Sequence, residues 1–194
     1  KTLTIGKIKQ AVEKYEPVVV QKDLLEEYTQ EAGVLVALYE EQNSLQVILT
    51  RRSPHLSSHA HQVSFPGGHQ EKVDKDLWST ALREAHEETG LDPSLPKKIG
   101  ELDPIVTVGS GTLIYPFVAL LPHRPELKAN SAEVETIRHV DLAELLKEET
   151  WREEYWEREE RSHAVTFFEI PNETIWGATA NILRQLLTLG LGIV

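Results

Sequence analysis

The chain has 194 residues, 40% of them hydrophobic and 26% charged, which is enough for one well-buried domain. Its formal net charge of −11, without any Lys/Arg-rich run, argues against a nucleic-acid backbone or an anionic membrane surface as partner. The absence of cysteine excludes disulfides, thiolate catalysis and cysteine-based zinc sites.

The N-terminal half begins with helical spacing and continues with strands. Residues 4–17 have the apolar spacing of a short helix, whereas residues 22–30 are polar enough for a second helix or a loop. Two β-rich runs at residues 32–40 and 44–52 are separated by EQN, which predicts a hairpin. The longest apolar run, PFVALLP, is far shorter than a membrane span, and residues 1–30 are too charged for a signal peptide.

A polar, histidine-rich loop then leads to a brief strand at residues 63–65, which PGG interrupts. A helix is expected from Asp76 or Leu77 to Gly90, because glycine commonly follows a helix end. Asp141 is a suitable N-cap for a short helix over residues 142–148. Further strands are expected at residues 99–102, 103–108, 113–121, 133–140 and 163–170.

The C-terminal region ends in an amphipathic helix, predicted over residues 178–189. Before it, residues 148–162 (EETWREEYWEREERS) are interpreted as a solvated helix or lobe whose aromatic side chains pack back onto the domain. No repeat or linker divides the chain, so helices should cover the faces of a sheet in a mixed α/β fold. We expect a cytoplasmic, single-domain protein over residues 1–194, with a peripheral segment at about residues 1–30 and a core at about 31–190.

The stretch TALREAHEETGL, residues 80–91, gathers three glutamates on one face of a predicted helix. Glu84, Glu87 and Glu88 fall within about 100° of arc, where like charges repel. Carboxylates are hard oxygen ligands that suit Mg²⁺ or Mn²⁺. A divalent ion that neutralised a diphosphate would expose its phosphorus to attack by water, so the helix indicates hydrolysis of a phosphoanhydride.

Two pairs of residues upstream could contact such a substrate. Gly67 and Gly68 permit a loop whose backbone closely approaches a metal or a phosphate. Arg51 and Arg52, at the end of a strand that leads towards this loop, are the best local cations for a substrate phosphate.

The order of residues around the glutamates resembles the Nudix box. That family's pattern is Gly, five residues, Glu, seven residues, then Arg-Glu-apolar-any-Glu-Glu-any-Gly-apolar. Arg83 to Leu91 match it at every specified position, and Gly68 begins it. Two departures lie in the first half, because Asp74 stands where glutamate is usual and one extra residue separates it from Arg83.

Residues 48–68 resemble the signature of the coenzyme A pyrophosphatase branch of this family, which reads Leu-Leu-Thr-any-Arg-Ser, three residues, Arg, three residues, Gly, three residues, Phe-Pro-Gly-Gly. Ser57 replaces the second Arg and His61 replaces the Gly, so the substrate is less certain than the type of reaction. Residues 175–183, IWGATANIL, are similar to a Trp-Gly-any-Thr-Ala segment of the same branch.

The resemblance implies the Nudix α/β/α sandwich with a central mixed sheet and a pyrophosphohydrolase dependent on Mg²⁺ or Mn²⁺. The implied reaction is hydrolysis of coenzyme A or its thioesters to 3′,5′-ADP and (acyl-)phosphopantetheine. Glu87 and Glu88 are the first implied metal ligands, Glu84 is a ligand or the general base, and a backbone carbonyl at Gly68 is a further ligand. Small-molecule diphosphates would be the partners, and homodimers are common in the family.

Arg83 and four further acidic residues gain roles from position or resemblance. Arg83 lies about 100° from the acidic face and should orient a glutamate through a bidentate pair, with Glu71 and Asp74 as candidate partners for the arginine. Many Nudix enzymes carry an additional loop glutamate for metal or base chemistry, and Glu133 or Glu135 could fill that role.

Several alternatives stay open at this point. The substrate could be another nucleoside diphosphate derivative, such as ADP-ribose, NADH or a damaged nucleotide, and the chain could also be a nucleotide-binding Nudix domain without turnover. Trp176 suits core packing or stacking on a base. Four histidines in one stretch suit either an exposed loop or a transition-metal site. They are His55, His59, His61 and His69.

Overall fold

The computed structural model describes residues 2–21, 30–56, 61–107 and 110–193, in which helices separate runs of three or four consecutive strands. The elements are α1 (Ile5–Lys14), β1 (Gln30–Glu41), β2 (Ser44–Arg52), β3 (Val63–Ser64), β4 (Gly67–His69), α2 (Leu77–Thr89), β5 (Lys97–Glu101), β6 (Ile105–Thr107), β7 (Thr112–Leu120), β8 (Val134–Asp141), α3 (Leu142–Leu145), β9 (Trp151–Arg158), β10 (Arg161–Ile170), β11 (Glu173–Trp176) and α4 (Gly177–Leu191). Residues 22–29, predicted as a helix or a loop, lie outside the described residues.

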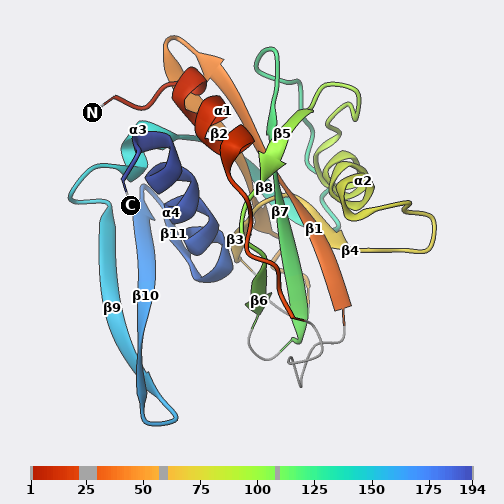
Figure 1. Cartoon of the computed structure of the whole chain (residues 1–194). Helices are drawn as coiled ribbons and strands as arrows, with labels where there is room; N and C mark the ends of the chain where they lie inside the picture. Colours follow the sequence, from red (N-terminus) through yellow and green to blue (C-terminus); the bar gives the residue numbers. More distant parts are fainter. Residues whose placement is uncertain (1, 22–29, 57–60, 108–109, 194) are drawn as a thin grey trace.

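The central sheet is mixed. β1 pairs in parallel with β7 and antiparallel with β2 and β4, in a sheet whose main order is β3-β2-β1-β7-β5. β8 pairs antiparallel with β2. Figure 1 shows α2 on one side of this sheet and α1 and α4 on the other. The predicted fold, an α/β/α sandwich with a central mixed sheet, is therefore confirmed.

Strand β1 is buried on both faces, as its nearly continuous apolar sequence requires. Val36 packs into the core on the side of α1 and α4, and Leu35 packs into the core beneath α2. Helix α1 contributes Ile8 and Val12, both at most 1% exposed, to the first of these cores. The segment expected at the periphery thus supplies core side chains.

The predicted β1–β2 hairpin is confirmed. Its turn residues Gln42 and Asn43 have φ values of 50° and 64°, the left-handed backbone that two-residue hairpin turns require. The predicted N-cap at Asp141 is also confirmed, because its side chain accepts a hydrogen bond from the Ala143 backbone N–H at 2.9 Å. None of the described helices is long and apolar enough to cross a membrane.

The helix considered for residues 148–162 is wrong, because most of this segment forms strand β9. β9, β10 and β11 make a separate three-stranded sheet, from which the β9–β10 hairpin extends away from the rest of the chain (Figure 1). A tight turn at Glu159 and Glu160, with φ values of 51° and 62°, reverses the chain. Tyr155 is 70% exposed, and the ring of Trp156 lies against Phe167 with centroids 6.0 Å apart.

Helix α2 begins and ends where the sequence predicts. Asp76 caps its first turn by accepting the Ser79 N–H at 2.8 Å, and Gly90 follows its last turn with φ 71°. The helix packs closely on β1, because a Cβ atom at Gly33 would lie 2.4 Å from the carbonyl oxygen of Leu77. This contact fixes α2 above the strand that pairs with β4.

Candidate metal-binding and catalytic site

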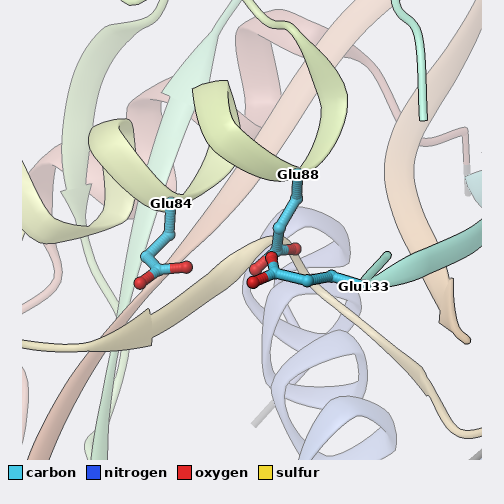
Figure 2. Close-up of side chains that lie close together, drawn as sticks. All are labelled: Glu84, Glu88 and Glu133. Carbon is cyan, nitrogen blue, oxygen red and sulfur yellow. The ribbon is translucent and has the colours of Figure 1, made fainter. Parts of the chain in front are cut away.

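Three carboxylates converge at one end of α2. Glu84 and Glu88 extend from the helix, and Glu133 reaches them from the loop before β8 (Figure 2). One carboxylate oxygen from each lies within 4.8 Å of those from the other two. Among the residues that the structure describes, this is the one group of at least three acidic or histidine side chains placed to hold a metal ion. We call these residues the carboxylate group.

Backbone hydrogen bonds hold Glu133 next to α2. Its carbonyl accepts the Ser53 N–H at 2.9 Å, and its own N–H donates to Asn130 at 3.0 Å. The Asn130 N–H in turn donates to the carbonyl of Glu88 at 2.9 Å. The loop is thereby fastened to both the end of β2 and the end of α2.

Glu133, in the loop before β8, and Glu135, in β8 itself, differ in their contacts. Glu133 belongs to the carboxylate group, whereas Glu135 lies 3.3 Å from the Arg51 Nε atom and 3.4 Å from the His61 Nδ1 atom. Sequence alone left these two residues equivalent. Their surroundings distinguish them, because only one of them faces Glu84 and Glu88.

Gly67 and Gly68 lie in strand β4, which corrects the expectation of a loop. β4 pairs antiparallel with β1, with Gly68 opposite Gly33. A Cβ atom on Gly68 would lie 2.5 Å from the carboxylate carbon of Glu84, and the backbone N–H of Gly67 lowers the pKa of Glu88. The missing side chains therefore let a paired strand, rather than a loop, press against the acidic face.

Arg83 is the centre of a second set of contacts. Its Nε and Nη2 atoms donate to Asp74 at 2.8 and 2.9 Å, which forms the bidentate pair that the sequence suggested. Its Nη1 atom donates to Glu84 at 3.1 Å and to Glu87 at 3.2 Å. Glu71 is more distant, at 3.9 Å. Glu87 thus contacts Arg83 and does not belong to the carboxylate group.

The buried Asp74 fixes this arginine. Its side chain is 3% exposed and also accepts the Glu71 N–H and the Thr80 hydroxyl, each at 2.9 Å. The hydrogen bonds from Arg83 hold the pKa of Asp74 well below its ordinary value. Aspartate is the shorter acid, and here it reaches the guanidinium despite the extra residue before the helix.

The carboxylates of Glu84 and Glu88 are costly to ionise together. Burial, followed by the nearby charge of Glu84, raises the pKa of Glu88 to about 8. Burial also raises the pKa of Glu84. A divalent cation would offset both effects, and an all-oxygen donor set suits a hard ion. The residues present therefore fit the metal that the glutamate pattern predicts.

Of the two arginines predicted to bind substrate phosphates, Arg52 acts on the carboxylate group, because its charge lowers the pKa of Glu88. Arg51 contacts Glu135 and Glu173 instead. Ser57 and His59 lie outside the described residues. Among the described residues, His55, His61 and His69 belong to no group of three or more side chains placed to hold a metal ion.

Comparison with known proteins identifies the family. The model of the Nudix domain matches residues 29–161, which include the carboxylate group and β1 to β9. The chain belongs to the Nudix family. This membership confirms the predicted class of enzyme, a pyrophosphohydrolase that acts on phosphoanhydride bonds, and Nudix hydrolases generally use divalent metal ions.

Curated Nudix relatives extend over most of this chain. A protein of Photorhabdus laumondii named uncharacterized Nudix hydrolase NudL is 41% identical over 140 residues, which cover 72% of this chain and 74% of that protein. Nudix hydrolase 22, chloroplastic, of Arabidopsis thaliana is 40% identical over 165 residues, covering 81% of this chain and 54% of that protein.

Solved Nudix structures share the fold at low sequence identity. A MutT/nudix family protein from Enterococcus faecalis aligns with 99% of this chain and 76% of its own at a TM-score of 0.56 and 14% identity. The Nudix domain of Shewanella oneidensis NrtR, solved in complex with ADP ribose, aligns with 66% of this chain and 87% of its own at a TM-score of 0.50 and 20% identity.

Proposed function

We propose that this Nudix hydrolase cleaves the diphosphate of coenzyme A or its derivatives, giving 3′,5′-ADP and (acyl-)phosphopantetheine. The convergence of Glu84, Glu88 and Glu133 supports hydrolysis of a diphosphate, because such a group can hold a divalent ion against two phosphates. The resemblance of residues 48–68 and 175–183 to the coenzyme A branch supports the substrate.

A contact between those two segments adds to this support. The hydroxyl of Thr179, which belongs to the Trp-Gly-any-Thr-Ala segment, donates to the carbonyl of Val63 at 3.1 Å. Val63 precedes the Phe65–Gly68 end of the other segment and lies in β3. A specified residue of one segment is therefore joined to the backbone of the other, 116 positions earlier in the sequence.

Mg²⁺ or Mn²⁺ would be held by the carboxylate group, with the backbone of Gly68 as an additional ligand. When bound, the ion neutralises the diphosphate and favours attack by water at phosphorus. Glu87, which the family pattern implies as a ligand, would have to leave Arg83 to join the others. Arg52 is the nearest predicted cation for the substrate phosphates.

The chain's own residues must also supply a proton acceptor for the attacking water. Glu84 and Glu133 are the candidates, since both face the space between α2 and the loop before β8 (Figure 2). Glu135 is a weaker candidate because Arg51 and His61 occupy its carboxylate. Arg83 would act through position, since its bidentate pair with Asp74 fixes it beside Glu84.

A substrate panel with each metal tests this proposal. We expect the purified protein with Mg²⁺ or Mn²⁺ to cleave coenzyme A with a higher kcat/KM than ADP-ribose or NADH, with 3′,5′-ADP detected by chromatography. Cleavage of ADP-ribose or NADH with coenzyme A left intact would overturn the substrate. Failure to cleave any diphosphate in the panel would favour a nucleotide-binding domain without turnover.

A further inference from the structure

A buried carboxylate joins two arginines outside the carboxylate group. Glu173 begins β11, and its side chain is 4% exposed. Its Oε1 atom lies 3.5 Å from Arg51 Nη1 on β2 and 3.7 Å from Arg138 Nε on β8. These three residues, which we call the Arg51–Glu173–Arg138 cluster, connect the small sheet to two strands of the central one.

Charge rather than hydrogen bonding holds the cluster together. Within the described residues, the Oε1 atom of Glu173 and the Nε atom of Arg51 are buried without a hydrogen-bond partner. A buried carboxylate is costly unless cations compensate it, and here two guanidinium groups do so. Without the carboxylate, those two guanidinium groups would repel each other.

The arginines keep donors for another anion. Arg138 donates one hydrogen bond, from Nη2 to the carbonyl of Pro171 at 2.9 Å, and its side chain is 30% exposed. Arg51 is 32% exposed, and its outer side faces Glu135 and His61, which are 38% and 53% exposed. An arriving phosphate could replace these two exposed side chains as the partner of Arg51.

The cluster is linked to the proposed diphosphate site through the end of β2, but it lies on the other face of the sheet. Arg51 pairs with Val63, which belongs to the core on the side of α1 and α4, whereas α2 covers the opposite face (Figure 1). Arg51 precedes Arg52, whose charge is felt by Glu88. Arg138 stands five positions after Glu133, a rise of roughly 16 Å along an extended chain that a long arginine side chain can partly span. Beyond it opens a cavity of about 880 Å³, lined by Thr136, Arg138 and Pro171 among others.

We propose that Arg51 and Arg138 bind a phosphate group of the substrate that lies outside the cleaved diphosphate, and that Glu173 is the positioning residue that holds them together. The inference rests on the proposed function, in which the metal already neutralises the diphosphate. A further pair of arginines then suits a further phosphate, because guanidinium groups bind phosphate through paired hydrogen bonds. In coenzyme A this group is the 3′-phosphate.

Kinetics on a matched pair of substrates test the inference. Coenzyme A and dephospho-coenzyme A differ only in the 3′-phosphate. Arg138→Gln and Glu173→Gln should each raise KM for coenzyme A roughly ten-fold, leave kcat within about two-fold, and leave both constants for dephospho-coenzyme A almost unchanged. Equal losses on both substrates would overturn the inference while leaving the proposed function intact.

Two controls separate positioning from folding. Glu153→Gln removes a comparable ion pair, to Arg184 at 2.9 Å, from the same small sheet and should change neither constant. Arg138→Lys keeps the charge and should recover part of the affinity for coenzyme A. If Glu173→Gln unfolds the protein, as circular dichroism would show, the partly exposed Arg138 variants still decide the question.

Calorimetry provides a test that needs no turnover. Wild-type protein should bind 3′,5′-ADP more tightly than 5′-AMP, and Arg138→Gln should remove most of that difference. An unchanged difference would overturn the inference whichever substrate the enzyme cleaves. A protein that shows the expected binding but does not cleave coenzyme A would instead contradict the proposed function alone.

Discussion

Two segments of this chain are rich in glutamate, and they handle the charge in opposite ways. Around α2, Glu84, Glu88 and Glu133 point at one another and partly bury their carboxylates. In the β9–β10 hairpin, glutamates are spread along an exposed ribbon and contact arginines. These pairs are Glu153 with Arg184, Glu154 with Arg152, and Glu169 with Arg152.

The difference shows that the density of acidic residues is a poor guide to a metal site. A strand turns successive side chains to opposite faces, so neighbouring glutamates in β9 separate and meet arginines. A helix brings positions i and i+4 together, and the loop before β8 adds a third carboxylate from a distant part of the sequence. Convergence and burial, rather than number, raise the pKa of Glu88 to about 8.

The largest expected effect follows from removing one converged carboxylate. Glu88→Gln should lower kcat on the cleaved diphosphate by about 100-fold or more, because the ion loses a buried ligand and the charge that balances it. Glu154→Gln in the hairpin is the matched control and should leave kcat unchanged. Steady-state kinetics at saturating metal would show the contrast, and similar rates for the two variants would contradict the assignment of Glu88.

In the metal-free protein, the pH dependence of the free energy of unfolding should show how costly it is to ionise Glu88. The pKa of Glu88 is about 8 in the folded protein and 4.5 ordinarily, so between these values the folded state binds more protons than the unfolded state. With EDTA, the free energy of unfolding should therefore fall as pH rises through this window, by roughly 1–3 kcal/mol.

Saturating Mg²⁺ should reduce that slope and raise the melting temperature, because the ion binds the folded state. Thermal denaturation of wild type with EDTA and with Mg²⁺ measures both effects. Glu88→Gln should show a flatter pH profile without metal and a smaller gain from Mg²⁺, whereas Glu154→Gln should follow wild type. A pH profile of Glu88→Gln as steep as that of wild type would refute this origin of the slope.

A smaller effect is expected from the pair that holds Arg83. Asp74→Asn leaves the guanidinium beside an amide, which should lower the free energy of unfolding by about 1–3 kcal/mol at neutral pH. Because Arg83 depresses the pKa of Asp74 below 3.8, the contribution of Asp74 is present above that pH and is lost as pH falls. Urea denaturation should show the two proteins converging in acid.

Activity distinguishes this role from a purely structural one. If Arg83 positions Glu84, Asp74→Asn should lower kcat by about ten-fold with little change in KM, and Asp74→Glu should restore part of it. Equal kcat values for wild type and Asp74→Asn, together with the loss of stability, would restrict the pair to folding.

Local signals in the sequence were sufficient to predict the bounds of α2, the glycine that follows it and the β1–β2 hairpin. Each depends on neighbouring residues, such as Asp76 with Ser79 or the turn at Gln42 and Asn43. The choice between Glu133 and Glu135 could not be made that way. It depends on how the loop before β8 is tied to Ser53 and Asn130, which are contacts between distant segments.

The β9–β10 hairpin could not be predicted from the sequence for a related physical reason. Its charged residues and tryptophans satisfy the spacing of a solvated helix as well as that of a strand, and only pairing with β10 decides between them. Glu173 could not be found from sequence either, because its role depends on Arg51 and Arg138 from two other strands. Strand β11, which carries it, has four residues and no clear apolar alternation.

The smallest expected effect concerns the most connected arginine of the hairpin. Arg152 contacts Glu154, donates to Glu169 at 2.9 Å, and has its guanidinium carbon 4.0 Å from the centre of the Phe167 ring. Its side chain is 42% exposed, and exposed ion pairs contribute little. Arg152→Gln should therefore lower the free energy of unfolding by less than about 1 kcal/mol, with kcat and KM unchanged.

Salt provides the decisive measurement for this variant. The small difference in the free energy of unfolding between wild type and variant should shrink further at high salt, because exposed charges are screened. The difference that remains should come from the contact of Arg152 with the Phe167 ring. A larger loss of stability, or a fall in kcat, would mean that the hairpin and the carboxylate group are coupled. The exposed ion pairs of the hairpin and the buried carboxylates near α2 would then belong to one functional site.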